Sequence, residues 1–134
     1  MKEDNSNIIV GGDFNLILHA NEKCGGNFQP DPFRSQMENI MHSGDLIDIA
    51  PKNRKFTWSN RRLDSHNIME RLDRFLVNIS LLSTFSVVNS VVLPFAVSDH
   101  YPITLALDNH CALGPLPFKF NHIWSDQQDD RSII

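Results

Sequence analysis

The chain has 134 residues, of which 41% are hydrophobic and 21% charged, and its formal charge is −4. This composition is that of an ordinary globular protein and argues against wholesale disorder and against a coiled coil, while the length suits one small domain. We expect an intracellular protein that does not cross a membrane, because no apolar run approaches about 20 residues, the first residues lack a signal pattern, and two cysteines make no disulfide framework.

In chain order, the first half predicts two strands separated by a loop and a helix. The β-branched run 8–10, closed by two glycines, is typical of a buried strand that leads into a tight turn. Residues 19–32 have the composition of a loop, and Asp31-Pro32 resembles a helix start. Apolar side chains at 33, 37, 40 and 41 would share one face of a helix, which we place over 32–43. Residues 46–49 are a short strand candidate.

The second half predicts mainly strands. Residues 55–59 are rich in strand-forming types and end in a turn, whereas 71–77 suits a helix or a strand equally. Asn78 is placed to cap a short helix that ends near residue 85. The runs 87–93 and 101–107 are strand candidates. After residue 107 the pattern ends, so 108–134 is predicted to be a linker or tail.

Basic side chains concentrate between positions 52 and 74, where seven of them accompany three acidic ones. Such a segment can place a positive stripe beside a phosphate backbone. The alternative is a solvated hairpin with scattered charges, and charge alone favours this second interpretation. The seven residues are Lys52, Arg54, Lys55, Arg61, Arg62, Arg71 and Arg74.

Polar side chains stand at points where strands are expected to begin or end. Asp13 and Asn15 can face the same side, where a carboxylate can take a proton from water and an amide can donate to a phosphate oxygen. The competing interpretation is an Asx turn. Asp99 and His100 precede the last strand, and a carboxylate favours the charged form of an imidazole, although a surface Asp–His pair is commoner than an active site. Asp73 could accept the other ring N–H of His100 or be neutralised by the arginines beside it.

The order and spacing of four motifs resemble those of the C-terminal half of an endonuclease/exonuclease/phosphatase superfamily domain. The resemblance is closest to the endonuclease domain of non-LTR (LINE-type) retrotransposons. It covers about residues 7–125, and the segment 114–124 looks like the part of such elements that leads toward the reverse transcriptase. The motifs are Gly11-Gly12-Asp13-Phe14-Asn15, Phe56-Thr57-Trp58, Arg71-Leu72-Asp73-Arg74-Phe75-Leu76-Val77 and Ser98-Asp99-His100-Tyr101-Pro102-Ile103.

The resemblance implies an α/β (α+β) fold in which two β-sheets pack face to face with helices outside, roughly one sheet from each half of the domain. We therefore expect residues 1–107 to form half of a four-layer α/β-sandwich of the exonuclease III / deoxyribonuclease type, mainly one mixed β-sheet with covering helices. The inner face of that sheet would expose more apolar surface than monomers usually show, which predicts self-association.

The activity that the resemblance implies is Mg²⁺-dependent hydrolysis of a DNA phosphodiester, with Mn²⁺ as a substitute metal. By position, Asp13 would orient and deprotonate the attacking water, and Asn15 would bind the scissile phosphate. His100, held by Asp73, would stabilise the charge that develops on the phosphate. Asp99 would lie at the metal and water site. The parent element's role implies a nuclear location, and the nucleic-acid-binding residues would be Arg61, Arg62, Arg71 and Arg74.

In this family the N-terminal half supplies the main metal-ligand Glu, and these 134 residues hold no counterpart. Glu22, Glu38 and Glu70 match none of the family's Glu motifs. We therefore expect a phosphodiesterase domain of retrotransposon origin that is catalytically incomplete, because groups that act as a unit fail together. The alternative is a domesticated module that binds nucleic acid or protein, through the basic segment and the exposed sheet face, without catalysis.

Overall fold

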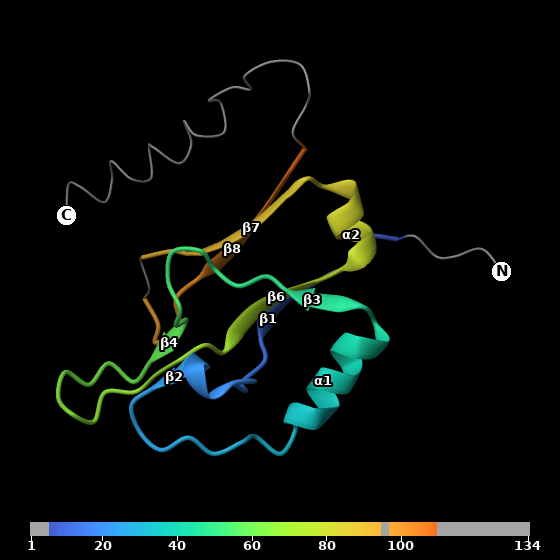
Figure 1. Cartoon of the computed structure of the whole chain (residues 1–134). Helices are drawn as coiled ribbons and strands as arrows, with labels where there is room; N and C mark the ends of the chain where they lie inside the picture. The colour runs from blue at the N-terminus through green and yellow to red at the C-terminus, as the bar shows by residue number, and fades with distance from the viewer. Residues whose placement is uncertain (1–5, 95–96, 110–134) are drawn as a thin grey trace, which may run out of the picture.

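The computed structural model describes residues 6–94 and 97–109, which form three small antiparallel sheets and two α-helices (Figure 1). The first sheet has the order β1-β6-β3, from Ile9–Asp13, Asp73–Asn78 and Leu46–Asp48. The second has the order β2-β5-β4, from Lys23–Cys24, Met69–Glu70 and Trp58–Ser59. The third pairs β7 (Val87–Val92) with β8 (Ile103–Asp108). The helices are α1 (Arg34–Ser43) and α2 (Ile79–Thr84), with a 3₁₀ turn at Ala20–Glu22.

The general α+β class is confirmed, but the prediction of one main mixed sheet is wrong. Within the described residues every strand pair is antiparallel, and the only parallel contact is an isolated bridge between Pro51 and Ser90. Nine residues separate β4 from β5 in the sequence, and ten separate β7 from β8. Such connections allow only antiparallel pairing, because parallel neighbours need a crossover of a dozen or more residues.

The segment that suited a helix or a strand equally is β6, the central strand of the first sheet. Successive side chains of a strand alternate between its two faces, so β6 directs its residues to both sides of the sheet. One face carries Arg74, Leu76 and Asn78, and the other carries Asp73, Phe75 and Val77. The strand ends at Asn78, and the predicted cap is present, since the Asn78 side chain accepts the N–H of Leu81 at 3.2 Å at the start of α2.

Helix α1 begins at Arg34, two residues after the predicted start. The Asp31 side chain accepts the N–H of Phe33 at 2.8 Å, so it stabilises the turn before the helix. Of the predicted apolar face, Met37 is buried, but Phe33 and Ile40 are 62% and 59% exposed. The helix therefore uses only part of that face to cover the described part of the chain.

The hydrophobic core lies between the first sheet and α1, which runs beside β3 in Figure 1. Its buried members are Leu18, Met37 and Leu76. Partly buried side chains complete it, namely Phe14, Leu16, Met41 and Leu46. This core covers the face of β6 opposite to Asp73.

Strand β1 is an edge strand, and within the described residues only β6 pairs with it. Gly11 lies opposite Phe75, whose ring covers it so closely that a Cβ on Gly11 would be 2.6 Å from two ring carbons. Side chains along β1 remain open, with Ile9 46% and Val10 39% exposed. The strand is thus packed on one edge and unprotected on the other.

The last described strand, β8, ends at Asp108, one residue beyond the predicted domain boundary at 107. The predicted tail 108–134 lies outside the described residues from position 110 onward. Neither described helix has the length and apolar character that a bilayer crossing requires.

Candidate active site

The pairing of β1 with β6 brings two carboxylates side by side at the end of the first sheet. Asp13 is the last residue of β1, Asp73 is the first residue of β6, and the two are register partners. Directly opposed residues of an antiparallel pair point to the same face. Like charges in such a pair repel each other, so a cation at this position stabilises both carboxylates.

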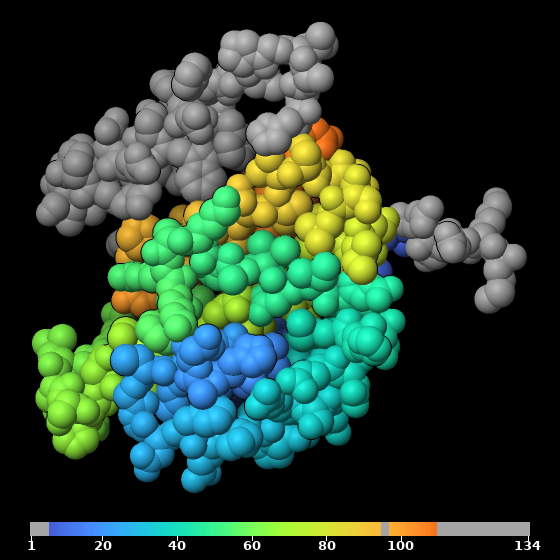
Figure 2. Space-filling model, viewed as in Figure 1, coloured from blue at the N-terminus to red at the C-terminus, as the bar shows by residue number. Residues whose placement is uncertain are grey.

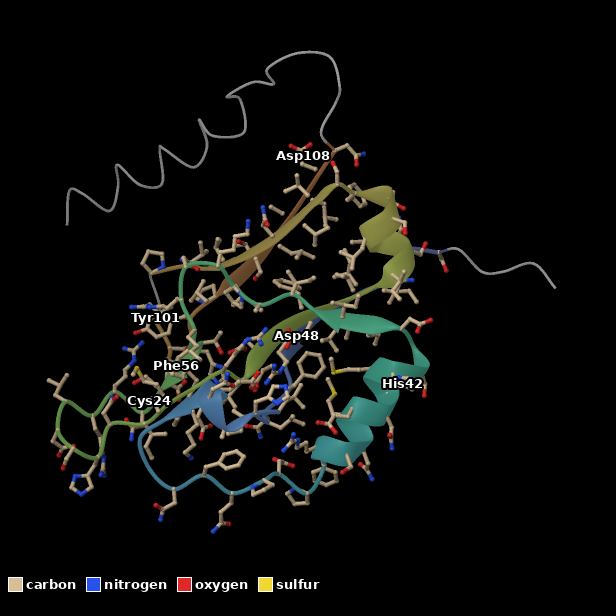
Figure 3. All side chains as sticks on the ribbon, viewed as in Figure 1. Cys24, His42, Asp48, Phe56, Tyr101 and Asp108 are labelled. Atoms are coloured by element: carbon tan, nitrogen blue, oxygen red, sulfur yellow. The ribbon has the colours of Figure 1, made fainter. Side chains whose placement is uncertain are left out.

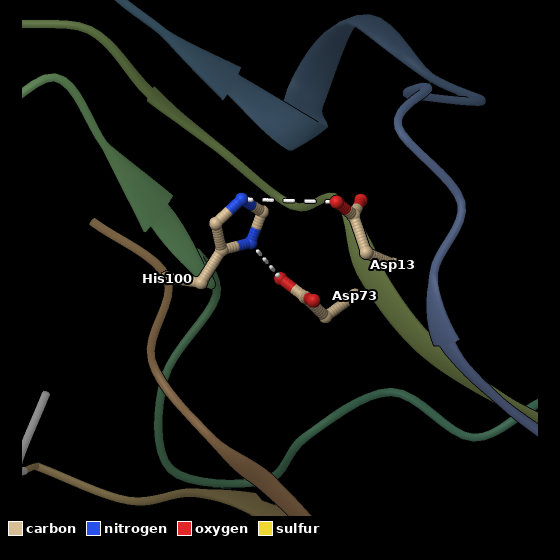
Figure 4. A group of neighbouring side chains, drawn as sticks. All are labelled: Asp13, Asp73 and His100. Atoms are coloured by element: carbon tan, nitrogen blue, oxygen red, sulfur yellow. Dashed lines mark hydrogen bonds and ion pairs between the residues drawn. The ribbon is translucent and has the colours of Figure 1, made fainter. Parts of the chain in front are cut away.

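His100 supplies that group and lies between the two carboxylates (Figure 4). Its Nδ1 is 2.9 Å from Asp73 Oδ2, and its Nε2 is 3.7 Å from Asp13 Oδ2. Backbone contacts fix the segment that carries the ring. His100 forms an isolated antiparallel β-bridge with Trp58, and the N–H of Tyr101 donates to the Thr57 carbonyl at 2.7 Å. Three separate parts of the chain therefore meet at one imidazole.

This environment favours the imidazolium form of His100. The hydrogen bond with Asp73 raises the pKa of the imidazole, and partial burial opposes that effect. The negative charges of Asp73, Asp13 and Asp99 raise the pKa further, so the net shift is upward. The ring is consequently protonated to a higher pH than an isolated histidine, with Nδ1–H donating to Asp73.

Thr57 fixes the position of Asp73 although no role was predicted for it. The side chain is fully buried, and its Oγ accepts the backbone N–H groups of Leu72 and Asp73, each at 3.0 Å. The same residue offers its carbonyl to Tyr101, next to His100. Thr57 thus joins the two halves of the cluster, and the only sequence signal for it was its place in the Phe56-Thr57-Trp58 motif.

Asn15 adopts the turn that the competing interpretation described. Its backbone has a φ of 53°, in the left-handed region that Asn tolerates, and its N–H donates to Asp13 Oδ1 at 2.8 Å. The side chain is exposed beside Asp13. The turn therefore holds one oxygen of Asp13 in place and leaves the Asn15 amide open at the surface of the site.

Asp99 is oriented by Trp58 and does not join the cluster. Its Oδ2 accepts the indole N–H of Trp58 at 2.9 Å, and this hydrogen bond is the main reason why the pKa of the carboxyl lies below its usual value. Among the described residues, the group whose ligand atoms lie within 4.8 Å of one another consists of Asp13, Asp73 and His100. Asp99 lies outside that group, and its place at the metal and water site stays a prediction.

The predicted role of Arg71 and Arg74 in nucleic-acid binding is corrected by their burial. Arg71 is 6% exposed and Arg74 0%, and both pair with Glu22 and Asp48. Arg74 Nη1 is 2.8 Å from Asp48 Oδ2 and 2.9 Å from Glu22 Oε1. Asp48, labelled in Figure 3, is the last residue of β3 in the first sheet, and its side chain is 19% exposed. These two arginines neutralise buried carboxylates, so their charges are not presented to a phosphate backbone.

Arg61 and Arg62 lie on the hairpin between β4 and β5, as predicted for exposed basic residues. Figure 2 shows this hairpin as a lime-green lobe that projects from the body of the molecule. Arg61 has a positive φ of 57° and donates to the Ser98 carbonyl, two residues before His100. Arg62 is exposed, and Leu63 beside it is fully open to solvent. The hairpin is therefore tied to the histidine segment at its base.

The donor set suits a hard divalent cation only in part. Mg²⁺ keeps several waters and takes one or two carboxylates together with substrate phosphates. Asp13 fits this requirement, because its carboxylate is 45% exposed. Asp73 is turned toward His100 and its side chain is only 13% exposed. The cluster thus offers one open carboxylate beside a histidine–carboxylate pair.

Comparison of the chain with protein-family models, with curated proteins and with solved structures gives no match. The resemblance to the endonuclease/exonuclease/phosphatase superfamily therefore stays a prediction from motifs.

Proposed function

We propose that Asp13, Asp73 and His100 belong to a phosphodiester-hydrolysing site of the endonuclease/exonuclease/phosphatase type, of retrotransposon origin, with nuclear DNA as its substrate. The single observation that carries this proposal is the position of His100 between two carboxylates. A protonated ring fixed by one partly buried acid, next to a second acid open to water, is suited to hydrolysis of a charged ester.

The two carboxylates have different roles in this proposal. Asp73 fixes the ring through Nδ1, so that Nε2 faces the side where Asp13 lies. An imidazolium held there stabilises negative charge as it develops on a phosphate oxygen. Asp13 is open to solvent and accepts the proton of the attacking water. The exposed Asn15 amide, adjacent to Asp13, donates to the scissile phosphate.

The metal that the family implies would be held mainly by Asp13, with Asp99 as a second carboxylate from the neighbouring segment. Mg²⁺, or Mn²⁺ in its place, polarises a phosphoryl oxygen and lowers the pKa of bound water when it is present. The open carboxylate of Asp13 supports this placement. With so few protein ligands among these 134 residues, we propose that they bind the metal weakly and that cleavage by them alone is slow.

The finer fold assignment, half of a four-layer sandwich, also belongs to this proposal. It is supported by exposed apolar side chains on the two outer strands of the sheet face that carries the cluster, on either side of the buried Val77. Ile9 and Ile47 are both register partners of Val77, so they share the face of Asp13 and Asp73. They are 46% and 38% exposed. A face of this kind is suited to packing against a further layer of the domain.

Plasmid nicking by the chain fused to the N-terminal half of a LINE-type endonuclease tests the proposal. We expect Mg²⁺-dependent nicking by the fusion, and little or none by the 134 residues alone. In the fusion, Asp13→Asn should abolish nicking and largely preserve DNA binding, because it removes the base and keeps the shape. Asp64→Asn, at an exposed acid on the hairpin, is the control and should nick normally. Nicking by the Asp13→Asn fusion at the unmutated rate would contradict the proposal.

A second candidate function is a binding module without catalysis. It is favoured by the exposed apolar residues at the start of β1, where Ile8, just before the strand, is 44% exposed and Ile9 and Val10 are 46% and 39% exposed. A fusion that binds DNA, folds cooperatively and never nicks would support this candidate in place of the first.

A further inference from the structure

A hollow of about 440 Å³ lies apart from the Asp13–Asp73–His100 cluster and shares none of its residues. The segment that follows β3 supplies one side of the hollow, with Lys52, Arg54 and Lys55. Arg71, Asp48 and His19 also line it. This volume is in the range of small-molecule sites.

The carboxylates that line the hollow do not repel a bound anion, because buried arginines neutralise their charges. Asp48 accepts from Arg71 at 2.9 Å and from Arg74 at 2.8 Å, and Glu22 is bound by the same two arginines. Two guanidinium groups thus balance two carboxylates. The electrostatic potential of the hollow is then set by the remaining charged side chains around it.

Those remaining side chains are all cationic. Within the described residues, no carboxylate lies within the 4.0 Å ion-pair distance of Lys52, Arg54 or Lys55. Three positive charges therefore lie within four residues of sequence, around a neutral group of buried ions. Such an arrangement attracts a multiply charged anion.

The basic segment is fixed to the neighbouring sheet. In Figure 1 the chain between β3 and β4 passes beside β7, where the Lys52 N–H donates to the Ser90 carbonyl at 3.0 Å. The Asn53 side chain bonds Val92 in both directions, accepting its N–H at 2.9 Å and donating to its carbonyl at 2.8 Å. The Arg54 guanidinium lies 4.7 Å from the centre of the Tyr101 ring. The backbone of this segment and the Arg54 guanidinium are thus held in place before a ligand binds, which lowers the entropy that they lose on binding.

Arg71 connects the hollow to the group of buried ions. It is 6% exposed and lines the hollow, and its Nε has no hydrogen-bond partner within the described residues. Buried donors are seldom left without an acceptor. Arg74, which does not line the hollow, has an unpaired Nε in the described part of the chain as well, so this feature belongs to the buried ion group that the two arginines share.

We propose that this hollow binds a phosphate group through Lys52, Arg54 and Lys55. Phosphate matches the cluster because it carries up to two charges and several acceptor oxygens for lysine and arginine donors. The phosphate comes from a nucleic-acid backbone or from a free phosphorylated molecule. The proposal is independent of the nuclease assignment, since no residue of the hollow belongs to the Asp13–Asp73–His100 cluster.

The test uses the 134-residue chain, with inorganic phosphate and a 20-nucleotide single-stranded DNA as separate probes. Amide NMR shifts and calorimetry report binding. We expect phosphate to shift the resonances of residues 50–55 saturably. The double variant Lys52→Gln/Lys55→Gln should weaken phosphate binding at least about tenfold, because two hydrogen bonds between charged groups are lost. Both lysines are exposed, so the variant should fold normally.

A matched pair of charge removals, Lys23→Gln/Arg34→Gln, controls for net charge at half-buried sites outside the hollow. It should leave phosphate affinity within about twofold, a change far smaller than that from losing charged hydrogen bonds. If a nucleic acid is the source, the plot of log K against log salt for DNA becomes less steep in the lysine variant. Each lost phosphate contact reduces the magnitude of the slope by about 0.7, so two lost contacts reduce it by about 1.4. An unchanged slope with saturable phosphate binding identifies a free phosphorylated molecule. Absence of saturable binding of both probes, or equal losses in both double variants, overturns the proposal.

Discussion

His100 gains its chemical character from neighbours that are distant in the sequence. Asp73 lies 27 positions away and Asp13 lies at the end of another strand, yet both face the same ring. Their combined effect raises the pKa of His100 above its ordinary value of 6.5. A single titration can therefore test whether the cluster exists in solution.

Substitution of Asp73 by Asn should lower the pKa of His100 toward 6.5, because the substitution removes the hydrogen bond that contributes most to the shift. NMR titration of the ring protons measures this value directly. The raised pKa also links His100 to stability. Its contribution is fully present below about pH 6.5, the ordinary value, and is lost as pH rises through the pKa of the folded protein. Identical pKa values in the two proteins would show that Asp73 does not contact the ring.

Removal of His100 should slow cleavage at least as much as removal of Asp73, because Asp73 acts through the ring. In the fused endonuclease we expect His100→Ala to lower the rate by about 10²–10⁴, the usual effect of losing a group that transfers or stabilises a proton. Asp73→Ala should lower it by an equal or smaller factor. Single-turnover nicking rates measure both. The opposite ranking would mean that the roles of the pair are wrongly assigned.

At the scale of secondary-structure elements, one group of buried ions connects the 3₁₀ turn, β3 and β6. Glu22 is the last residue of the turn, Asp48 lies in β3 and Arg74 lies in β6. Glu22 also accepts the Leu18 N–H at 2.7 Å. Burial raises the pKa of the Glu22 carboxyl, but the bonds and charges of the arginines and the Leu18 N–H outweigh this effect, so the net shift is downward.

Glu22→Gln should destabilise the fold by about 3 kcal/mol, because it leaves two buried guanidinium groups with one carboxylate. The matched control is Glu38→Gln, which removes an exposed partner of Arg34 on α1 and should cost less than about 0.5 kcal/mol. Urea unfolding gives both values. The depressed pKa of Glu22 adds a pH dependence, since its stabilisation is present above about pH 4.5 and is lost as pH falls through the folded pKa. Equal losses in the two variants at pH 7 would contradict this account.

The elements that sequence predicted well depend on short-range patterns. The Asn78 cap, the end of α1 before Gly44 and the strand over 87–93 each need only neighbouring residues. The pairing of Asp73 with His100 was also predicted, from the order of the motifs. The burial of Arg71 and Arg74 was not, because arginine is usually exposed and its partners here lie 23 to 52 positions away. The role of Thr57 was also missed, because it depends on how distant strands align and no local pattern specifies that alignment.

At the scale of the whole molecule, the unprotected edge of β1 is the most distinctive surface. The Ile8 carbonyl accepts the N–H of Asn78, and the Phe14 N–H donates to Leu72. Because hydrogen bonding alternates along an antiparallel strand, residues 9, 11 and 13 direct their backbone groups away from β6. The edge carries neither proline nor lysine, the usual protection against pairing with another chain.

The 134-residue chain should therefore self-associate through this edge, with the apolar side chains of β1 adding burial. Sedimentation velocity between micromolar and millimolar concentrations should show a weight-average mass that rises with concentration. Ile9→Lys places a charge on a 46% exposed position of the edge and should shift the protein toward monomer. Leu63→Lys makes the same change at the fully exposed tip of the β4–β5 hairpin and should leave association unchanged. A monomer whose mass and unfolding transition do not depend on concentration would contradict the prediction, and equal effects of the two lysines would place the contact elsewhere.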